Sequence, residues 1–269
     1  MIPRNPRITF EDALPHWAPN HSFAQITNAG STSLPNVETY LNKIVARAAL
    51  EIEDCQLKED MRLFTAQEGN HYRQHRLFNK TLYTRYPKLK VLEDDLGRDY
   101  ERMLARTSLR MNAAYCEGFE STGIIYAEFF FEQIDDLTKD ADQRLVKLWR
   151  WHLAEEFEHR TVCFDIHNAL GGGYFRRILG FIWASIHLGR YSKRVSQYML
   201  SVDRETMTPE QRRESIRLEK QYRARLGRFA FSHMLKVFSP RYNPRTKRAP
   251  RGSFELLSEI AAAGGPQPA

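Results

Sequence analysis

The chain has 269 residues, of which 42% are hydrophobic and 27% are charged, and these values are ordinary for a globular protein. No stretch reaches the roughly 18 apolar residues that span a bilayer, and three distant cysteines form neither a disulfide framework nor a zinc motif. The net charge of +7 suits an anionic membrane or solvated helix faces, and we expect no nucleic-acid partner. The sequence predicts a cytoplasmic protein, and a position on the inner face of the membrane is the alternative.

The N-terminal residues 1–33 hold four prolines and scattered Ser and Asn, which predicts an irregular arm. A first helix is expected from Ser33, a suitable N-cap, with Pro35 in its first turn, and it should run towards Asp54. Glu38 lies near the start of this helix. Its carboxylate can either complement the helix dipole or act as a ligand.

Two long helices are predicted next, at Leu57–Tyr83 and Asp99–Gln133, with Pro87 after the first of them. The fourth helix follows a break at residues 138–141 and contains neither Gly nor Pro until Gly171. The middle of the chain is rich in Ala, Leu, Glu and Arg, and it lacks the alternation of apolar and polar residues that is typical of a strand. The sequence therefore predicts an all-α protein.

The remaining chain is predicted to form additional C-terminal helices over residues 171–244. The segment Tyr174–Leu200 carries an apolar patch flanked by Arg and Lys, which either packs on the bundle or lies against a membrane surface or a second copy of the chain. A basic helix is expected at Pro209–Phe238. Residues 245–269 are predicted to be a mostly disordered tail.

Two Glu-x-x-His motifs carry the functional signal. Glu68 and His71 lie on the second helix, and Glu156 and His159 lie on the fourth. Residues three apart share one helix face, and these faces also carry apolar residues such as Phe64. Burying a carboxylate among imidazoles is costly unless a cation lies between them. The motifs therefore indicate metal ligands.

Each motif follows a helix with a single Glu that faces the core, Glu38 in one case and Glu120 in the other. One Glu from each of two helices and Glu-x-x-His from the other two is the ligand set of ferritin-like di-metal bundles, here over residues 34–170. Glu68 and Glu156 would bridge two ions. The predicted metal ligands are Glu38, Glu68, His71, His75, Glu120, Glu156 and His159. Mixed N/O ligation suits two divalent ions, with iron favoured and manganese or zinc as alternatives.

These residues resemble the family of predicted metal-dependent hydrolases, bacterial proteins with a ferritin-like helical core. The resemblance covers residues 31–244. It rests on Leu34-Pro35-Asn36-Val37-Glu38, Gln67-Glu68-x-x-His71-x-x-x-His75-x-x-x-Asn79, Glu120-Ser121-Thr122 and Trp149-Arg150-Trp151-His152-x-x-Glu155-Glu156-x-Glu158-His159. It implies a metal-dependent enzyme built on a helical bundle.

The ligand set leaves three functions open. A carboxylate-rich, His-poor centre inside a bundle favours a di-iron enzyme that activates O₂ to oxidise an apolar small molecule, by analogy with other helical bundles. The alternative is a hydrolase that uses a metal-bound hydroxide, with Glu155 or His152 as general base. A non-catalytic metal-binding or membrane-associated protein is the third interpretation. His75 and His152 are additional ligands, hydrogen-bond partners of the ligands or proton shuttles.

Overall fold

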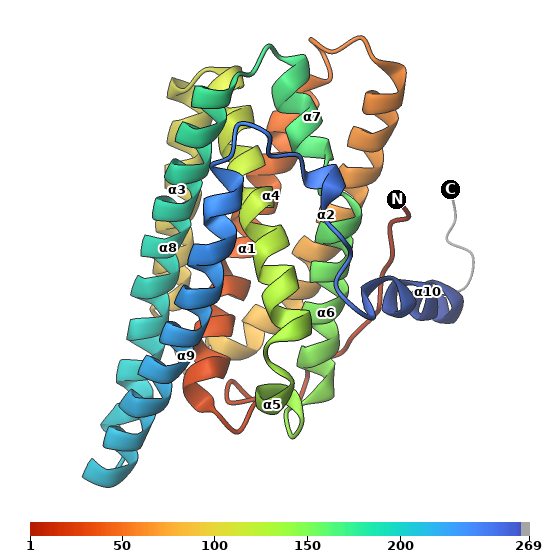
Figure 1. The fold of residues 1–269 in the computed structure, drawn as a ribbon. Helices are drawn as coiled ribbons and strands as arrows, with labels where there is room; N and C mark the ends of the chain where they lie inside the picture. The colour runs from red at the N-terminus through yellow and green to blue at the C-terminus, as the bar shows by residue number, and fades with distance from the viewer. Residues whose placement is uncertain (265–269) are drawn as a thin grey trace.

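The computed structural model describes residues 1–264 and contains only helices and connecting segments over that range (Figure 1). The all-α prediction is therefore confirmed. The helices are α1 (His21–Ala48), α2 (Cys55–Leu82), α3 (Leu89–Arg106), α4 (Leu109–Glu132), α5 (Asp135–Thr138), α6 (Gln143–Glu158), α7 (Val162–Ala169), α8 (Tyr174–Glu205), α9 (Pro209–Val237) and α10 (Ser253–Gly264), with a 3₁₀ turn at Pro244–Thr246. Helices α1, α2, α4 and α6 form the bundle around the centre described below, and α8 packs along α4 and α1.

Helix α1 begins twelve residues earlier than the expected start at Ser33, so only residues 1–20 form the irregular arm. The Asn20 side chain caps the helix by accepting a hydrogen bond from the backbone N–H of Phe23 at 3.0 Å. Pro35 therefore lies inside the helix and cannot donate to the carbonyl of Ser31. The side-chain amide of Asn79, on α2, donates to that carbonyl instead, at 3.0 Å. This contact stabilises a proline within α1.

The predicted helix Asp99–Gln133 is two helices, α3 and α4, separated by Thr107 and Ser108. Thr107 is extended, with φ −109° and ψ 141°, and the Ser108 hydroxyl caps α4 by accepting from the backbone N–H of Met111. Residues 93–95, which lie between the second and third predicted helices, are inside α3. A Ser N-cap that begins a new helix can thus interrupt a long helical segment at a point where the sequence has no Gly or Pro.

The expected continuous helix up to Gly171 is likewise divided, into α6 and α7, with His159 at the C-cap of α6. The Arg160 guanidinium donates to the carbonyl of Phe157 at 2.7 Å and to that of Pro244 at 3.0 Å. These bonds satisfy a carbonyl that the helix itself leaves free at its end. The break leaves the His159 ring buried beside the last turn of α6.

Two glycines let α4 and α8 approach closely. A Cβ at Gly118 would lie 2.5 Å from the Cα of Phe181, and a Cβ at Gly180 would lie 2.2 Å from the carbonyl oxygen of Ala114. Any larger side chain at either position would force the helices apart. This packing holds α8 on the bundle.

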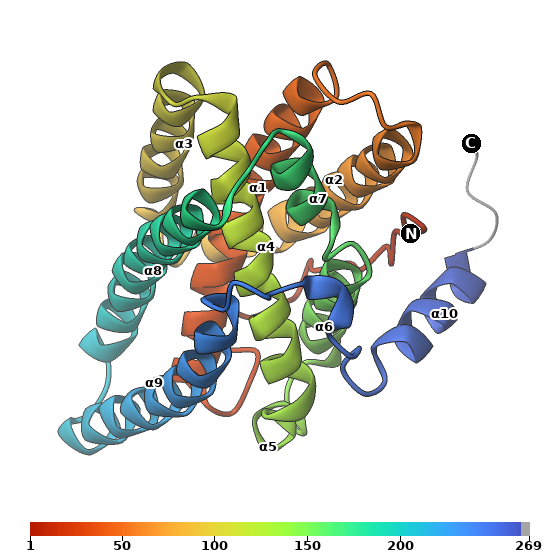
Figure 2. The ribbon, with the colours of Figure 1, turned by 45° about the horizontal axis from the view of Figure 1, so that its top comes forward.

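The C-terminal segment is more ordered than the predicted tail. Helix α10 packs on α6, with Leu257 and Ile260 buried and the rings of Phe157 and Phe254 6.4 Å apart. Both views place α10 beside α6 (Figure 2). The predicted disorder is therefore wrong for residues 253–264, because their apolar side chains find partners on α6. Residues 265–269 lie outside the described part of the chain.

Between residues 1 and 264, no helix is both long and apolar enough to cross a bilayer.

Candidate metal centre

Four glutamates from four different helices converge in the middle of the bundle. They are Glu38 on α1, Glu68 on α2, Glu120 on α4 and Glu156 on α6. Each is at most 2% exposed, and so are the three histidines that lie with them, His71, His152 and His159. Such complete burial of four carboxyl groups is unusual and requires a compensating charge.

The first group of candidate ligands consists of Glu38, His71 and His152, whose ligand atoms lie within 4.8 Å of one another. The Nδ1 atom of His152 is 3.8 Å from Oε1 of Glu38. The Nδ1 atom of His71 lies 3.7 Å from Oε1 of Glu68 and 3.9 Å from Oε1 of Glu156. These separations are too long for hydrogen bonds and leave space for an ion between the atoms.

The second group consists of Glu68, Glu156 and His159. The Nε2 atom of His159 lies 3.3 Å from Oε1 of Glu68 and 3.6 Å from Oε2 of Glu156. Glu120 joins this group, since its Oε2 atom is also 3.3 Å from the His159 nitrogen. Glu68 and Glu156 thus lie between the two groups, with His71 and His152 on one side and His159 on the other, as bridging carboxylates would.

The carboxyl oxygens of this centre lack well-formed hydrogen bonds. Among the described residues, no hydrogen bond of good geometry is made to any of the eight oxygens of Glu38, Glu68, Glu120 and Glu156, although the ring nitrogens of His152 and His159 come within 3.2–3.3 Å, and none of these oxygens is exposed. The inward nitrogens of His71 and His159 also lack a partner. Each buried polar atom left without a partner costs free energy of about 1–3 kcal/mol, and more if it is charged. Bound divalent cations would satisfy this donor set, so the residues present fit a metal centre.

Electrostatics within the centre reflect the crowding of the carboxyl groups. Burial, together with the charge of Glu68, raises the pKa of Glu38 well above its usual value, and burial with the charge of Glu156 does the same for Glu120. Burial also acts to raise the pKa of Glu156, but His152 and His159 hold it well below its usual value. One carboxylate is therefore stabilised in the charged form by the imidazoles on either side of it.

The neighbouring carboxylates also set the pKa values of His71 and His159. Burial lowers the pKa of His71, but the carboxylates of Glu155 and Glu68 outweigh that effect and raise it to about 10. The pKa of His159 is raised as well, because Glu120 and Glu156 outweigh burial. Cations at the positions of those protons would make the same contacts, and metal ions compete for sites of this kind by displacing protons.

The outer nitrogen of each motif histidine is held by the residue that precedes the Glu of the other motif. The Nε2 atom of His71 is 3.0 Å from Oε2 of Glu155, and the Nδ1 atom of His159 is 3.0 Å from Oε1 of Gln67. Partners of this kind fix the ring orientation of ligand histidines. Gln67 is not among the predicted site residues, although it precedes Glu68 as Glu155 precedes Glu156.

The N-terminal arm reaches the same residues through Arg4, which is 7% exposed. Its guanidinium donates to Glu155 at 3.1 Å and to Glu158 at 2.9 Å, and the Gln67 amide donates to Glu158 at 2.6 Å. Arg4 therefore connects to both outer partners of the histidines. No local sequence signal marks Arg4, because the contact spans about 150 residues.

Gly123 leaves room for the Glu156 carboxylate. A Cβ at this position of α4 would lie 2.8 Å from Oε2 of Glu156, closer than any ordinary contact. Gly123 is one turn from Glu120 on the same helix. The lack of a side chain at Gly123 thus leaves space between α4 and α6 for the Glu156 carboxylate.

The two remaining predicted site residues differ in their surroundings. His75 joins neither group, because its Nδ1 atom lies 2.8 Å from the Ser31 hydroxyl and its ring packs against Trp149 and His152. Burial and the neighbouring charge of His152 lower its pKa well below the usual value. Glu155, predicted as a catalytic residue, accepts from Arg4 and contacts His71. Its carboxylate is already engaged, which favours a positioning role.

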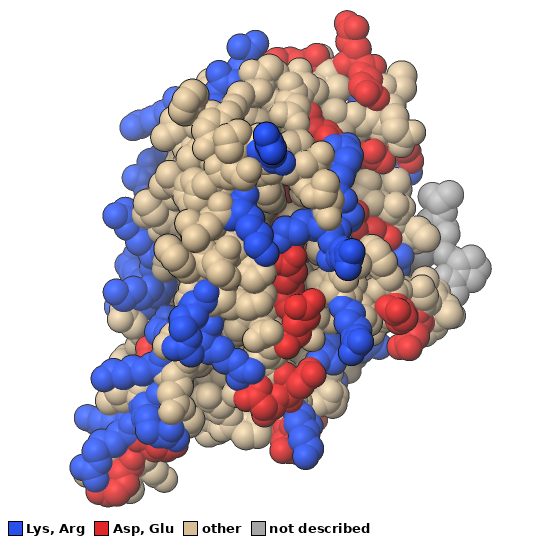
Figure 3. All heavy atoms as spheres, in the orientation of Figure 1, with Lys and Arg blue, Asp and Glu red and all other residues tan. Residues whose placement is uncertain are grey.

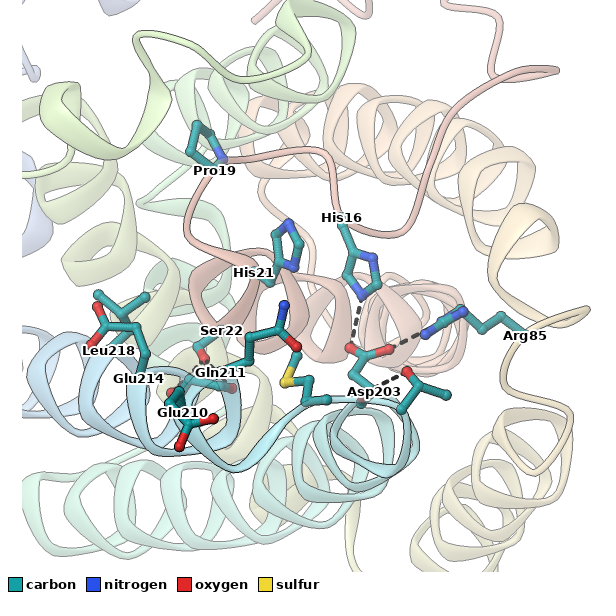
Figure 4. Close-up of a pocket in the computed structure, with 13 residues that line it drawn as sticks. His16, Pro19, His21, Ser22, Arg85, Asp203, Glu210, Gln211, Glu214 and Leu218 are labelled. Carbon is teal, nitrogen blue, oxygen red and sulfur yellow. Dashed lines mark hydrogen bonds and ion pairs between the residues drawn. The ribbon is translucent and has the colours of Figure 1, made fainter.

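A pocket of about 670 Å³ lies elsewhere in the molecule (Figure 4). Asp203 anchors it, with His16 at 2.8 Å, Arg85 at 3.0 Å and the Tyr86 hydroxyl at 2.7 Å. None of the predicted metal ligands lines this pocket. Through these contacts Asp203, on α8, connects that helix to the N-terminal arm and to the segment after α2. This structural role accounts for the cluster.

The fold and the centre define an all-helical protein with a buried carboxylate–histidine site able to hold divalent metal ions. The family model described as "Predicted metal-dependent hydrolase" matches residues 2–248, and the chain belongs to that family. The expected family is thereby confirmed. Neither curated proteins nor solved structures gave a match.

Proposed function

We propose that this chain holds two divalent metal ions and hydrolyses a small substrate that carries an ester, amide or phosphate group. The observation that carries the proposal is the set of eight buried carboxyl oxygens without well-formed hydrogen bonds, which lie with three imidazoles in two groups. The family description supports hydrolysis over the oxidation that the sequence pattern favoured. Divalent ions in such a centre act as Lewis acids and lower the pKa of the water they bind.

The residues of the chain would divide the work. Glu38 and His71 would hold one ion, Glu120 and His159 the other, and Glu68 and Glu156 would be shared. Four carboxylates against two divalent ions give a neutral centre, which suits a bundle core. Arg4, Glu155 and Gln67 would keep the imidazoles in orientation rather than touch the substrate.

His152 is the candidate for proton transfer. Its Nε2 atom lies 3.2 Å from Oε1 of Glu156, at the junction of the two groups. Burial and the charge of His71 lower the pKa of His152, against the influence of Glu156. The ring is therefore neutral at pH 7, and a neutral imidazole can accept a proton from an attacking water or serve as a further ligand.

The test is a hydrolysis assay on protein stripped of metal and reloaded with Zn²⁺, Mn²⁺ or Fe²⁺, using chromogenic esters, anilides and phosphate esters. We expect turnover that requires metal and that Glu68→Gln abolishes. Glu59→Gln, which alters a half-exposed carboxylate on the same helix, should retain it. Turnover that is absent with every metal, or equal in both variants, would contradict the proposal.

A second candidate is activation of O₂ by two iron ions, which the apolar wall of the centre favours. The Phe64 ring lies 4.7 Å from that of His159, and the Trp151 ring lies 4.9 Å from that of His71. Aromatic groups in these positions exclude water, as oxidation of an apolar molecule requires. Anaerobic loading with Fe²⁺ followed by O₂ decides between the two: rapid O₂ consumption without hydrolytic turnover supports this candidate and contradicts hydrolysis.

A further inference from the structure

The charges of the chain are unevenly distributed along its C-terminal part. Residues 171–202 and 220–254 hold fifteen of the 40 Lys and Arg and none of the 33 Asp and Glu. The rest of the chain has 25 basic against 33 acidic residues. The excess positive charge therefore resides in the segments that form most of α8, the second half of α9 and the chain up to the start of α10.

The exposed side of α8 is apolar in its first half. Phe175 is 81% exposed, Leu179 59% and Ile186 47%, and Ile182 is exposed as well. Their spacing of three or four residues places them on one stripe of the helix. This stripe faces away from Gly180, which lies against α4. None of these side chains contributes to the bundle core, so their exposure needs another explanation.

Helix α9 extends the apolar stripe. Phe231 is 66% exposed and Leu235 is 55% exposed. The Tyr174 hydroxyl donates to the carbonyl of Phe238 and the Arg177 guanidinium to that of Val237, so the first turn of α8 lies beside the last turn of α9. The exposed apolar residues in the first half of α8 and those in the last turns of α9 are therefore close in space. We call the six residues Phe175, Leu179, Ile182, Ile186, Phe231 and Leu235 the apolar patch.

Basic residues without ion pairs surround the apolar patch. Arg190 and Lys193 continue the α8 stripe, and Arg228 and Lys236 flank Phe231 and Leu235 on α9. All four are exposed, and among residues 1–264 none of them forms an ion pair. Figure 3 shows mostly uncharged atoms over the upper parts of α8 and α9, with Lys and Arg gathered along the α8 edge and lower on α9. Apolar side chains inside a basic border are the pattern of membrane-surface helices.

We propose that the outer face of α8 and α9 binds the surface of an anionic lipid bilayer. The apolar patch would enter the boundary between headgroups and acyl chains, and the basic border would contact the lipid phosphates. A second copy of the chain fits this face less well. A two-fold contact through the apolar patch would bring the basic border against its own copy, with no acidic residue in either segment to neutralise it.

The test is co-sedimentation of the full chain with vesicles of phosphatidylcholine, alone or with part of it replaced by phosphatidylglycerol. We expect binding to the anionic vesicles, weakened by added salt, and little binding to the neutral ones. Phe175→Ser with Leu179→Ser should lower the partition coefficient at least about tenfold, since each loses an apolar side chain worth about 1.5–3 kcal/mol when buried. Arg190→Gln with Lys193→Gln should lower it about fivefold for each charge.

Leu50→Ser with Lys58→Gln is the matched control, because both side chains are exposed and lie on the connection before α2 and on α2 itself. This variant should bind vesicles like the unaltered chain. Three results would overturn the proposal: no preference for anionic vesicles, equal loss in the control, or unchanged binding in both patch variants. Sedimentation velocity adds a fourth, since dimers that the patch variants dissociate, without vesicle binding, would assign the face to self-association.

Discussion

The Glu156 carboxylate and Gly123 show how one residue pair shapes the centre. The neighbouring imidazoles hold the pKa of Glu156 well below its usual value, and its Oε2 atom occupies the space that a side chain at Gly123 would need. Glycine in a helix costs about 1 kcal/mol relative to alanine. This loss of helix stability is expected if position 123 must lack a side chain so that the bridging Glu156 carboxylate fits.

We predict that Gly123→Ala lowers metal affinity roughly tenfold or more while leaving the helical content unchanged, because the methyl group displaces the Glu156 carboxylate. Gly69→Ala is the control: it alters a helical glycine next to Glu68 whose Cβ would meet nothing closer than 3.9 Å. Competition with a chromophoric chelator measures the affinity of each. Equal affinity in the two variants would show that Gly123 does not govern the Glu156 position.

Glu117 is a buried carboxyl group outside the centre, and it makes stability depend on pH. Burial raises its pKa to about 7, against the influence of Arg177 and of the Ser121 hydroxyl 3.0 Å away. A carboxyl group with a raised pKa in the folded state is fully stabilising only below its unfolded pKa of about 4.5. The free energy of unfolding should therefore fall as the pH rises from 4.5 through 7.

We predict that Glu117→Gln is more stable than the unaltered chain at pH 8, by up to about 3 kcal/mol, and that the difference disappears near pH 4. Urea denaturation of the metal-free proteins at several pH values measures this. Glu101→Gln, at an exposed position of α3, should show no such pH-dependent gain. A destabilisation by Glu117→Gln that grows with pH would mean that Arg177 stabilises the ionised form.

At the scale of elements, the N-terminal arm and the ligand helices act together. Arg4 lies in a segment without helix, yet its contacts with Glu155 and Glu158 lead to the outer nitrogens of both motif histidines. Removing one partner of a buried ion pair leaves an uncompensated charge. The arm is therefore expected to influence how well α2 and α6 present their ligands.

We predict that Arg4→Ala weakens metal binding about 10- to 100-fold without loss of helix, the range typical of changes to the partners of ligand histidines. Isothermal titration with Zn²⁺ and far-UV circular dichroism are the two readouts. Arg7→Ala, which alters an exposed arginine of the same arm, should bind metal normally. Unchanged affinity in Arg4→Ala would limit the arm to a covering role.

The elements also show which features the sequence could predict. The periods of three and four residues placed Glu68, His71 and Glu156 on inward faces, because helix geometry is local and regular. The start of α1 was missed because Pro35 and Ser33 imitate a helix N-terminus, and only the Asn79 side chain on α2 makes the internal proline tolerable. The helix breaks at Ser108 and Arg160 were missed for a similar reason, because each depends on a side chain that hydrogen-bonds to the backbone at a helix end.

At the scale of the whole molecule, the centre combines residues from both halves of the chain. The unit of one Glu followed by Glu-x-x-His occurs twice, and each unit supplies the outer partner for the histidine of the other. The order of the units could be predicted from sequence, since it needs only spacing. The contacts of Arg4, Gln67 and Gly123 could not, because they depend on how the helices pack against each other.

Metal content is the most direct test of the central claim that four helices bring carboxylates and imidazoles together around two cations. We expect inductively coupled plasma mass spectrometry of the metal-loaded, desalted chain to find two divalent ions per molecule, one for each group of ligands. Glu156→Ala and His71→Ala should lose this stoichiometric metal and remain helical. A metal-free unaltered chain after loading, or unchanged content in both variants, would contradict the account.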